Sequence, residues 1–246
     1  MSPPSSLAGA TIAFDLDGTL VETAPDLIGA LNIVLGERGL PMLPNEAARV
    51  LVGRGARALL ERGFAAAGHP LRADEAGGLV ARFIEVYRGR IASESLPFPN
   101  LLEALDALAA EGAKLVVCTN KRTDLSVALL DALQMTSRFA AVVGADGAPA
   151  AKPDPRHYLA AIAAAGGDVR HSLMVGDSIN DVAAAQAAGA PVVVVSFGYT
   201  DIPAAELGAE ALIDDFNELP AVARRLLSGL PGRSASAIGT PSPMDA

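Results

Sequence analysis

The sequence predicts an α/β fold: a Rossmann-like parallel sheet core with helices on both faces and an inserted all-helical cap domain. The first observation is that short apolar runs alternate with helical patterns along residues 101–227. Strands that lack a polar face are typical of parallel sheets covered on both sides. The second is that residues 23–95 interrupt this alternation and show helical patterns with little strand character.

The predicted sheet begins with one isolated strand and resumes after the helical segment. The apolar run at residues 11–14 predicts the first strand, which ends at an acidic residue. The later apolar runs predict strands at residues 114–118, 139–143, 172–175, 191–195 and 211–213. Helical patterns separate or follow them at residues 101–110, 124–133, 155–165, 179–188 and 219–227. We therefore expect the first strand to join the later ones in a single sheet.

The inserted segment contains amphipathic stretches near residues 26–38, 56–67 and 74–91. Gly and Pro residues punctuate the stretches between them. We expect three parts, namely an α/β core, a helical cap and a disordered tail rich in Gly, Pro and Ser. Their boundaries are 1–22 with 96–227 for the core, 23–95 for the cap and 228–246 for the tail.

The composition of the chain indicates which classes of partner it can bind. The 246 residues carry 28 acidic and 19 basic side chains, a formal net charge of −9. Such a surface repels nucleic acid and anionic lipid, although a few cations in one pocket can still bind a small anion. Cys118 is the only cysteine, which favours a reducing compartment. Without a signal-peptide pattern or a long apolar run, we expect a cytoplasmic protein that binds neither nucleic acid nor membrane.

Polar side chains gather where the predicted strands end. Ligands of parallel α/β sheets bind outside the carboxyl ends of the strands, so these residues are candidates for a site. Three strand ends and one loop supply Asp15 and Asp17, then Thr119 and Asn120, then Lys152, and finally Asp177 and Asp181. Carboxylates, a hydroxyl and an ammonium group are thereby expected in one crevice.

These residues form four ordered motifs: Asp15-Leu16-Asp17-Gly18-Thr19, Thr119, Lys152 and Gly176-Asp177-Ser178-Ile179-Asn180-Asp181. In this order and spacing the sequence resembles the haloacid dehalogenase superfamily, over nearly the whole chain up to about residue 227. Within it, the chain looks most like the phosphoglycolate phosphatase group. The residues behind that closer resemblance are 15–26, Val52-Gly53-Arg54-Gly55-Ala56, Thr119-Asn120-Lys121 and Lys152-Pro153-Asp154-Pro155.

The resemblance implies a magnesium-dependent phosphomonoesterase that forms an aspartyl-phosphate and hydrolyses 2-phosphoglycolate to glycolate and phosphate. Asp15 would attack phosphorus, a known role of carboxylates. Asp17, on the same face of an extended segment, would act as general acid and base. Thr119 and Lys152 would contact the phosphoryl group. The Mg²⁺ ligands would be Asp15, the backbone carbonyl of Asp17, and Asp177.

Three further residues receive secondary roles. Asp181 would support the metal site or cap the following helix. Asn120 and Arg54 would contact the substrate, a small phosphorylated metabolite, with Arg54 reaching its non-phosphate end from a cap loop. That loop, Gly53-Arg54-Gly55-Ala56-Arg57-Ala58, also fits a loose dinucleotide fingerprint, but no βαβ unit surrounds it.

Other functions remain open at this point. The same residues suit a phosphatase for a sugar phosphate, a nucleotide or pyrophosphate, or a phosphomutase that returns the phosphoryl group to its substrate. A dehalogenase is disfavoured because Asp17 supplies an acid that carbon–halogen displacement does not need. A binding protein without catalysis is disfavoured because Asp15, Asp17, Thr119, Lys152 and Asp177 are all present.

Overall fold

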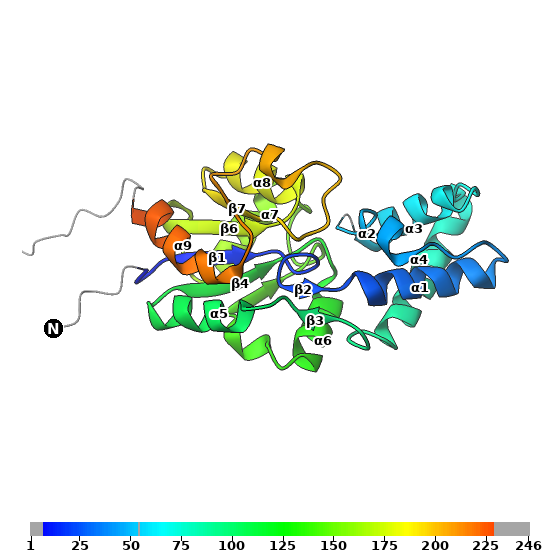
Figure 1. The fold of residues 1–246 in the computed structure, drawn as a ribbon, viewed down its shortest axis with the longest axis horizontal. Helices are drawn as coiled ribbons and strands as arrows, with labels where there is room; N and C mark the ends of the chain where they lie inside the picture. Colours follow the sequence, from blue (N-terminus) through cyan, green and yellow to red (C-terminus); the bar gives the residue numbers. More distant parts are fainter. Residues whose placement is uncertain (1–6, 54, 229–246) are drawn as a thin grey trace, which may run out of the picture.

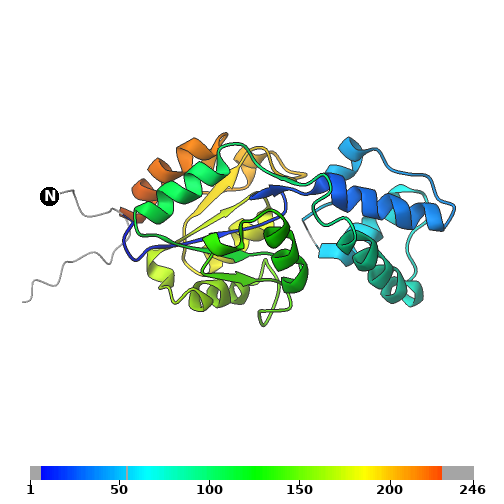
Figure 2. The ribbon, with the colours of Figure 1, turned by 90° about the horizontal axis from the view of Figure 1, so that it is seen from below.

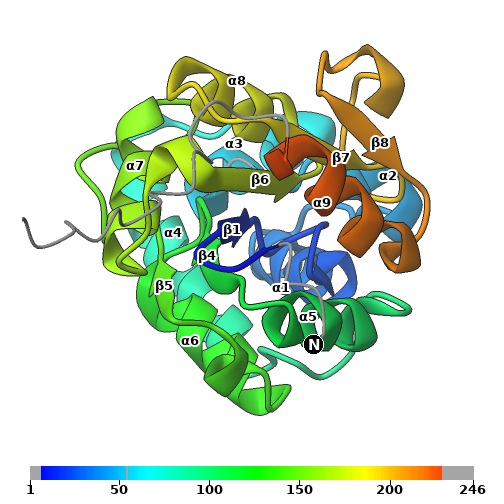
Figure 3. The same cartoon turned by 90° about the vertical axis from the view of Figure 1, so that its left-hand side faces the viewer.

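A parallel sheet forms the centre of the computed structural model, which describes residues 7–53 and 55–228. Within these residues, six strands pair in the order β5-β4-β1-β6-β7-β8 (Figures 1 and 3), and every pairing is parallel. Their bounds are β1 Thr11–Phe14, β4 Lys114–Cys118, β5 Ala141–Val143, β6 Ser172–Gly176, β7 Val192–Val195 and β8 Ala211–Ile213. The predicted fold class is confirmed, and the first strand lies in the middle of the sheet.

The central strands β1, β6 and β7 are buried on both faces because helices cover both. Their bounds are α5 Leu101–Ala110, α6 Thr123–Ala132, α7 Pro155–Ala164, α8 Ile179–Ala187 and α9 Leu219–Ser228. Figure 3 shows α7 and α8 on one side of the sheet and α5 and α9 on the other. Side chains alternate accordingly: Val117 packs with the α5 and α9 side, whereas Val116 packs with the α7 and α8 side.

The strand register brings the polar ends of three strands together. Phe14 lies opposite Val117 of β4 and Val175 of β6. The residues that follow these positions therefore emerge at one edge of the sheet, which is the edge where parallel α/β proteins place their ligands.

Four helices lie between β1 and β4 in the sequence: α1 Ala24–Glu37, α2 Asn45–Arg49, α3 Gly55–Ala66 and α4 Ala73–Arg88. Figures 1 and 2 show them beside the sheet, at the end where the polar residues emerge. They have a core of their own, in which Leu31, Leu35, Leu60 and Phe83 are buried. Two short antiparallel strands, β2 Val21–Glu22 and β3 Leu96–Pro97, join them to the rest of the chain.

Asp26 is a fully buried carboxylate in the first turn of α1. It connects the two chain segments that link the four helices to the rest of the protein. Its Oδ2 accepts hydrogen bonds from the amides of Glu94 (2.9 Å) and Ser95 (2.8 Å) and from the Ser95 hydroxyl (2.7 Å). The Arg90 guanidinium donates to Oδ1 at 3.2 Å. Burial alone would raise the pKa of Asp26, but these donors outweigh it and lower the pKa. The start of α1 is thereby fixed to the segment that leads into β3.

The patterns in the sequence did not predict the shortest secondary-structure elements, and they misplaced the ends of some others. Neither α2 nor the β2–β3 pair was expected, because two to five residues carry too little periodicity. The strand expected at 139–143 begins only at Ala141, since a 3-10 turn at Thr136–Arg138 precedes it. The other 3-10 turns are Val169–His171, Ala204–Glu206 and Phe216–Glu218. Ser228, expected in the tail, ends α9, and residues 229–246 lie outside the described part. Among described residues, no helix is long and apolar enough to cross a membrane.

Candidate active site

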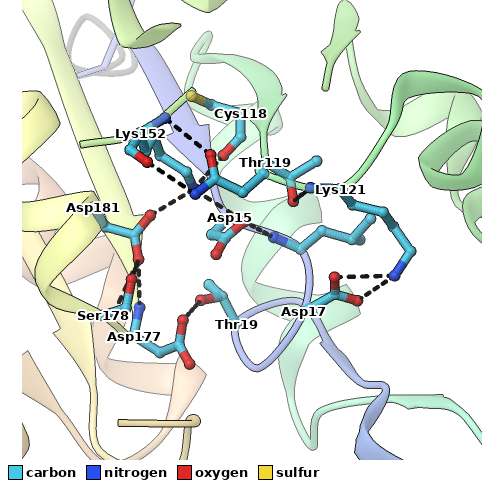
Figure 4. Close-up of polar contacts among 12 residues, drawn as sticks. Asp15, Asp17, Thr19, Cys118, Thr119, Lys121, Lys152, Asp177, Ser178 and Asp181 are labelled. Atoms are coloured by element: carbon cyan, nitrogen blue, oxygen red, sulfur yellow. Dashed lines mark hydrogen bonds and ion pairs between the residues drawn. The ribbon is translucent and has the colours of Figure 1, made fainter. Parts of the chain in front are cut away.

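The carboxyl ends of β1, β4 and β6 bring Asp15, Thr119 and Asp177 together, and the loop before α7 adds Lys152 (Figure 4). All four are buried, with at most 4% of their surface exposed. Charged groups are rarely buried unless they are paired or bind a ligand. Their contacts therefore indicate what this edge of the sheet can do.

Lys152 stands at the centre of the cluster. Its Nζ donates to the Cys118 carbonyl at 2.7 Å and to Asp181 Oδ1 at 2.6 Å, and it lies 3.0 Å from Asp15 Oδ1. Burial alone would lower the pKa of this ammonium, but the carboxylates of Asp15 and Asp181 outweigh it and raise the pKa. Lys152 therefore stays charged at neutral pH, with all three donors directed at fixed acceptors.

Asp15 is held in one orientation by contacts to a single oxygen. Its Oδ1 faces Lys152 and also accepts a hydrogen bond from the Leu16 amide at 2.7 Å. Burial raises the pKa of Asp15 to about 6, against the opposing effect of Lys152 and with further increases from Asp181 and Asp17. At pH 7 and above the carboxylate is predominantly ionised, as a nucleophile must be.

Asp177 faces the same space from the end of β6. Its Oδ1 accepts from the Thr19 hydroxyl at 3.2 Å, and its Oδ2 accepts from the Tyr199 amide at 2.6 Å. Burial, followed by the charges of Asp181 and Asp15, raises its pKa well above the usual value. Gly18, at φ +85°, allows this approach, since a Cβ there would overlap the Asp177 carboxylate.

Asp15, Asp177 and Asp181 form a group whose ligand atoms all lie within 4.8 Å of one another. Three buried carboxylates face a single ammonium, so negative charge is in excess and their mutual repulsion is uncompensated. Such a donor set, made of hard oxygen atoms, fits a divalent cation. The cluster thus has the composition of a metal site.

Both carboxylate oxygens of Asp181 accept hydrogen bonds from other groups of the protein. Its Oδ2 accepts from the Ser178 amide (3.0 Å) and hydroxyl (2.6 Å), which completes a capping box at the start of α8. Its Oδ1 accepts from Lys152. Asp181 therefore fixes both the helix and the ammonium.

Asp17 points away from Asp15 (Figure 4). Its two carboxylate oxygens lie 2.7 and 3.0 Å from Lys121 Nζ. That ammonium also lies 4.6 Å from the centre of the Tyr87 ring, close enough for a cation–π contact. Figure 4 shows Asp177 and Asp181 on one side of Asp15, and the Asp17–Lys121 pair on the other.

The residues expected to contact substrate are placed differently. The Thr119 hydroxyl accepts from the Lys121 amide at 3.2 Å, at the edge of the cluster. The Asn120 amide group donates to the Lys152 carbonyl (3.0 Å) and accepts from the Lys152 amide (2.9 Å), so its side chain fixes the Lys152 loop. Arg54 lies outside the described residues.

The model of the haloacid dehalogenase-like hydrolases matches residues 10–189. The chain belongs to this family. The resemblance inferred from the four motifs is confirmed, and the matched segment includes every strand end that contributes to the cluster.

Relatives of this hydrolase share its sequence over most of its length. A phosphoglycolate phosphatase of Caulobacter vibrioides is 60% identical over 94% of this chain and 98% of its own. One from Agrobacterium fabrum is 47% identical over 87% of this chain and 93% of its own. A crystal structure described as a predicted phosphoglycolate phosphatase from Haemophilus somnus superposes with a TM-score of 0.80 at 32% identity, covering 87% of this chain and 97% of that one.

Sequence reasoning gave no role to three residues that line or support the hydrolase site. Lys121 follows Thr119 and Asn120 directly, and this position beside a strand end was the available signal. Tyr87 of α4 and Tyr199 come from elsewhere in the chain and had no such signal. Tyr199 supports Asp177 through its amide, while its hydroxyl accepts from the amides of Thr23 (2.7 Å) and Ala24 (3.0 Å).

Proposed function

We propose that this hydrolase is a Mg²⁺-dependent phosphatase that converts 2-phosphoglycolate and water to glycolate and phosphate. The observation that carries the proposal is the position of Asp15: a buried carboxylate, held through one oxygen, with a lysine and two further acids on one side and Asp17 on the other. The substrate is suggested by relatives that bear the name phosphoglycolate phosphatase at up to 60% identity.

In the first half of the reaction, an Asp15 carboxylate oxygen attacks phosphorus in line with the ester oxygen. The bond from phosphorus to that ester oxygen breaks, and the leaving oxygen takes a proton from Asp17. Lys152 offsets negative charge on the phosphoryl group while it keeps its contact with Asp15. Thr119 donates its hydroxyl hydrogen to a phosphoryl oxygen.

In the second half, water attacks the phosphorus of the aspartyl-phosphate. The Asp17 carboxylate, now ionised, removes a proton from that water, and the bond from phosphorus to Asp15 breaks. Phosphate leaves, and both carboxyl groups return to their starting forms. Before the first step, Asp17 must leave its ion pair with Lys121 and take up a proton from water, since both of its oxygens face that ammonium.

The residues that would hold the metal are Asp15, Asp177 and the backbone carbonyl of Asp17, with Asp181 as a supporting carboxylate. Bound Mg²⁺ would neutralise the phosphoryl oxygens and position them against Asp15. The excess of carboxylates over ammonium groups supports this assignment, because a dianionic phosphate would otherwise be repelled.

We divide the chain into a core of residues 1–22 and 96–227 and a cap of residues 23–95. Helices α1–α4 stand at the end of the sheet where the cluster lies, as a cap must to exclude water during transfer. The single cysteine, buried Cys118, supports a cytoplasmic location.

A panel of small phosphoesters tests the function. Purified enzyme with Mg²⁺ is assayed for phosphate release from 2-phosphoglycolate, hexose phosphates, nucleoside monophosphates and pyrophosphate. The highest kcat/KM is expected for 2-phosphoglycolate. A higher value for another member of the panel would replace the substrate, whereas turnover without phosphate release would indicate a mutase.

Asp177→Asn tests the metal site. Loss of one charged ligand is expected to weaken Mg²⁺ binding by about 10- to 100-fold, taking as a guide the effect of changing groups around bound metals. Isothermal titration of Mg²⁺ into wild type and variant measures this directly, without any activity assay. Asp214→Asn, an exposed change outside the cluster, is the control. Equal Mg²⁺ affinity in wild type and Asp177→Asn would remove Asp177 from the ligand set.

A further inference from the structure

A small cavity lies beside Asp17, between the helical segment and the edge of the sheet. Its walls include Leu27, Leu59 and Phe83 from the helices and Lys121 from the sheet side. Its volume is about 60 Å³, measured as space open to the centre of a water molecule. Since one water needs about 10–15 Å³ on this measure, the cavity has room for a group of only a few atoms.

Tyr87 lines this cavity, and its hydroxyl lies next to the Lys121 ammonium, which can only donate to it. The side chain is fully buried, and the hydroxyl hydrogen has no acceptor among the described residues. Its ring stacks on Phe83 with centres 6.1 Å apart and planes 5° apart, which limits rotation away from the cavity. Burial raises the pKa of Tyr87 to about 12, so the hydroxyl keeps its proton at neutral pH. A buried donor without an acceptor is costly and indicates a missing partner.

Lys121 supplies a positive charge at the same place. Burial alone would lower the pKa of its ammonium, but Asp17 outweighs it and raises the pKa. The ammonium has three donors, and it faces the two Asp17 oxygens and the Tyr87 hydroxyl. A charged donor and a neutral donor therefore line a space whose other walls are mostly apolar, with Asp17, Asn120 and Arg122 as the remaining polar residues. This arrangement suits a small anion with an attached apolar carbon, such as a carboxymethyl group.

The cavity also lies on the correct side of the nucleophile. The Asp17–Lys121 pair is on the opposite side of Asp15 from Asp177 and Asp181 (Figure 4). With the phosphoryl group at Asp15, the leaving group extends toward Asp17, its proton donor. The part of the substrate beyond the ester oxygen then enters the cavity next to Tyr87.

We propose that the Tyr87 hydroxyl and the Lys121 ammonium bind the carboxylate of the substrate, and that this contact draws Lys121 away from Asp17. The inference rests on the proposed function and assigns its specificity to two residues. A carboxylate accepts from both donors and competes with Asp17 for the ammonium. Asp17, no longer paired with the ammonium, takes up a proton from water and can then give it to the leaving oxygen. A phosphoester without an anionic end leaves the Asp17–Lys121 pair intact and reacts slowly, so selectivity lies in kcat as well as in KM.

The test compares 2-phosphoglycolate with ethyl phosphate, in which a methyl group replaces the carboxylate. For each enzyme, the ratio of the two kcat/KM values measures recognition of the carboxylate. Tyr87→Phe is expected to lower this ratio by about 10-fold, and Lys121→Met by about 100-fold, as expected for losing donors to a charged group. Lys121→Arg keeps the cation and is expected to recover part of the ratio. Tyr158→Phe is the matched control, because that buried hydroxyl is bonded to Ser172 on another side of the core.

Two results would overturn the inference. They differ in whether the proposed substrate is also wrong. If Tyr87→Phe and Lys121→Met slow both substrates equally, the two residues only pack the cap, and the proposed function stands without this subsite. If wild-type enzyme shows no preference for 2-phosphoglycolate over ethyl phosphate, both the subsite and the proposed substrate are wrong. A selective loss in kcat/KM, shared between kcat and KM, is the supporting outcome.

Discussion

Asp15→Asn is expected to lower kcat by at least about 10⁴-fold while the protein remains folded, as for the loss of a catalytic nucleophile in other enzymes. A neutral amide is a poor nucleophile and cannot form the aspartyl-phosphate. Phosphate release measures the loss, and circular dichroism checks the fold. Asp168→Asn is the control, since Asp168 lies before β6, at the opposite end of the sheet, in an exposed pair with Arg170. Activity retained in Asp15→Asn would assign the nucleophile to another group.

The same variant has a second expected effect, on stability without metal. Because the pKa of Asp15 is raised to about 6, the folded state holds this proton more tightly than the unfolded chain does. The contribution of Asp15 to stability is therefore greatest below pH 4 and is lost as the pH rises through 6. Asn carries no such charge, so the melting temperature of Asp15→Asn relative to wild type should increase from pH 4 to pH 7 in the presence of a chelator. An unchanged difference would contradict the raised pKa.

Lys152→Met is expected to lower the free energy of unfolding by about 3–5 kcal/mol, the usual cost of removing one partner from a buried ion pair. The ammonium compensates two buried carboxylates, Asp15 and Asp181, and Met fills similar space without charge. Urea unfolding at pH 7.5 measures the change. Activity should also fall, since the phosphoryl group loses its nearby cation.

Lys114→Met provides the comparison for this substitution. The Lys114 ammonium donates a hydrogen bond to the Gly166 carbonyl, and its side chain is exposed at the start of β4. Its replacement should change the free energy of unfolding by less than about 1 kcal/mol. If Lys152→Met were as mild as this control, the carboxylates around it would have to be neutral in the folded protein, contrary to the ion pairs described above.

Much of the core could be predicted because its signals are local. The apolar runs at Thr11–Phe14, Lys114–Cys118 and Ala211–Ile213 form strands with the expected bounds. The first two runs are almost entirely buried, whereas Leu212 of the third is exposed at the edge of the sheet, and each run is flanked by a change of pattern. The candidate cluster could also be anticipated, since parallel strands end at one edge and bring Asp15 and Asp177 together whatever the details of packing.

The structure alone decided which charges pair. Asp17 was expected to share the space of Asp15, but its carboxylate faces Lys121 instead, and Asn120 is committed to the Lys152 loop. Ion pairs depend on rotamers and on distances between segments that are far apart in the chain. Asp17 and Lys121 are 104 positions apart, so no local pattern connects them.

By itself, then, the sequence determined the class of fold, the edge of the sheet where chemistry occurs and the family of hydrolases, because apolar periodicity and residues after strand ends are properties of short segments. The tertiary structure decided how the helical segment meets that edge. Tyr87 lies near the end of α4, without any motif of its own, yet packing places its hydroxyl beside the Asp17–Lys121 pair. Burial, which removes competing water and makes an unpaired donor costly, exists only once the helices have packed against the sheet.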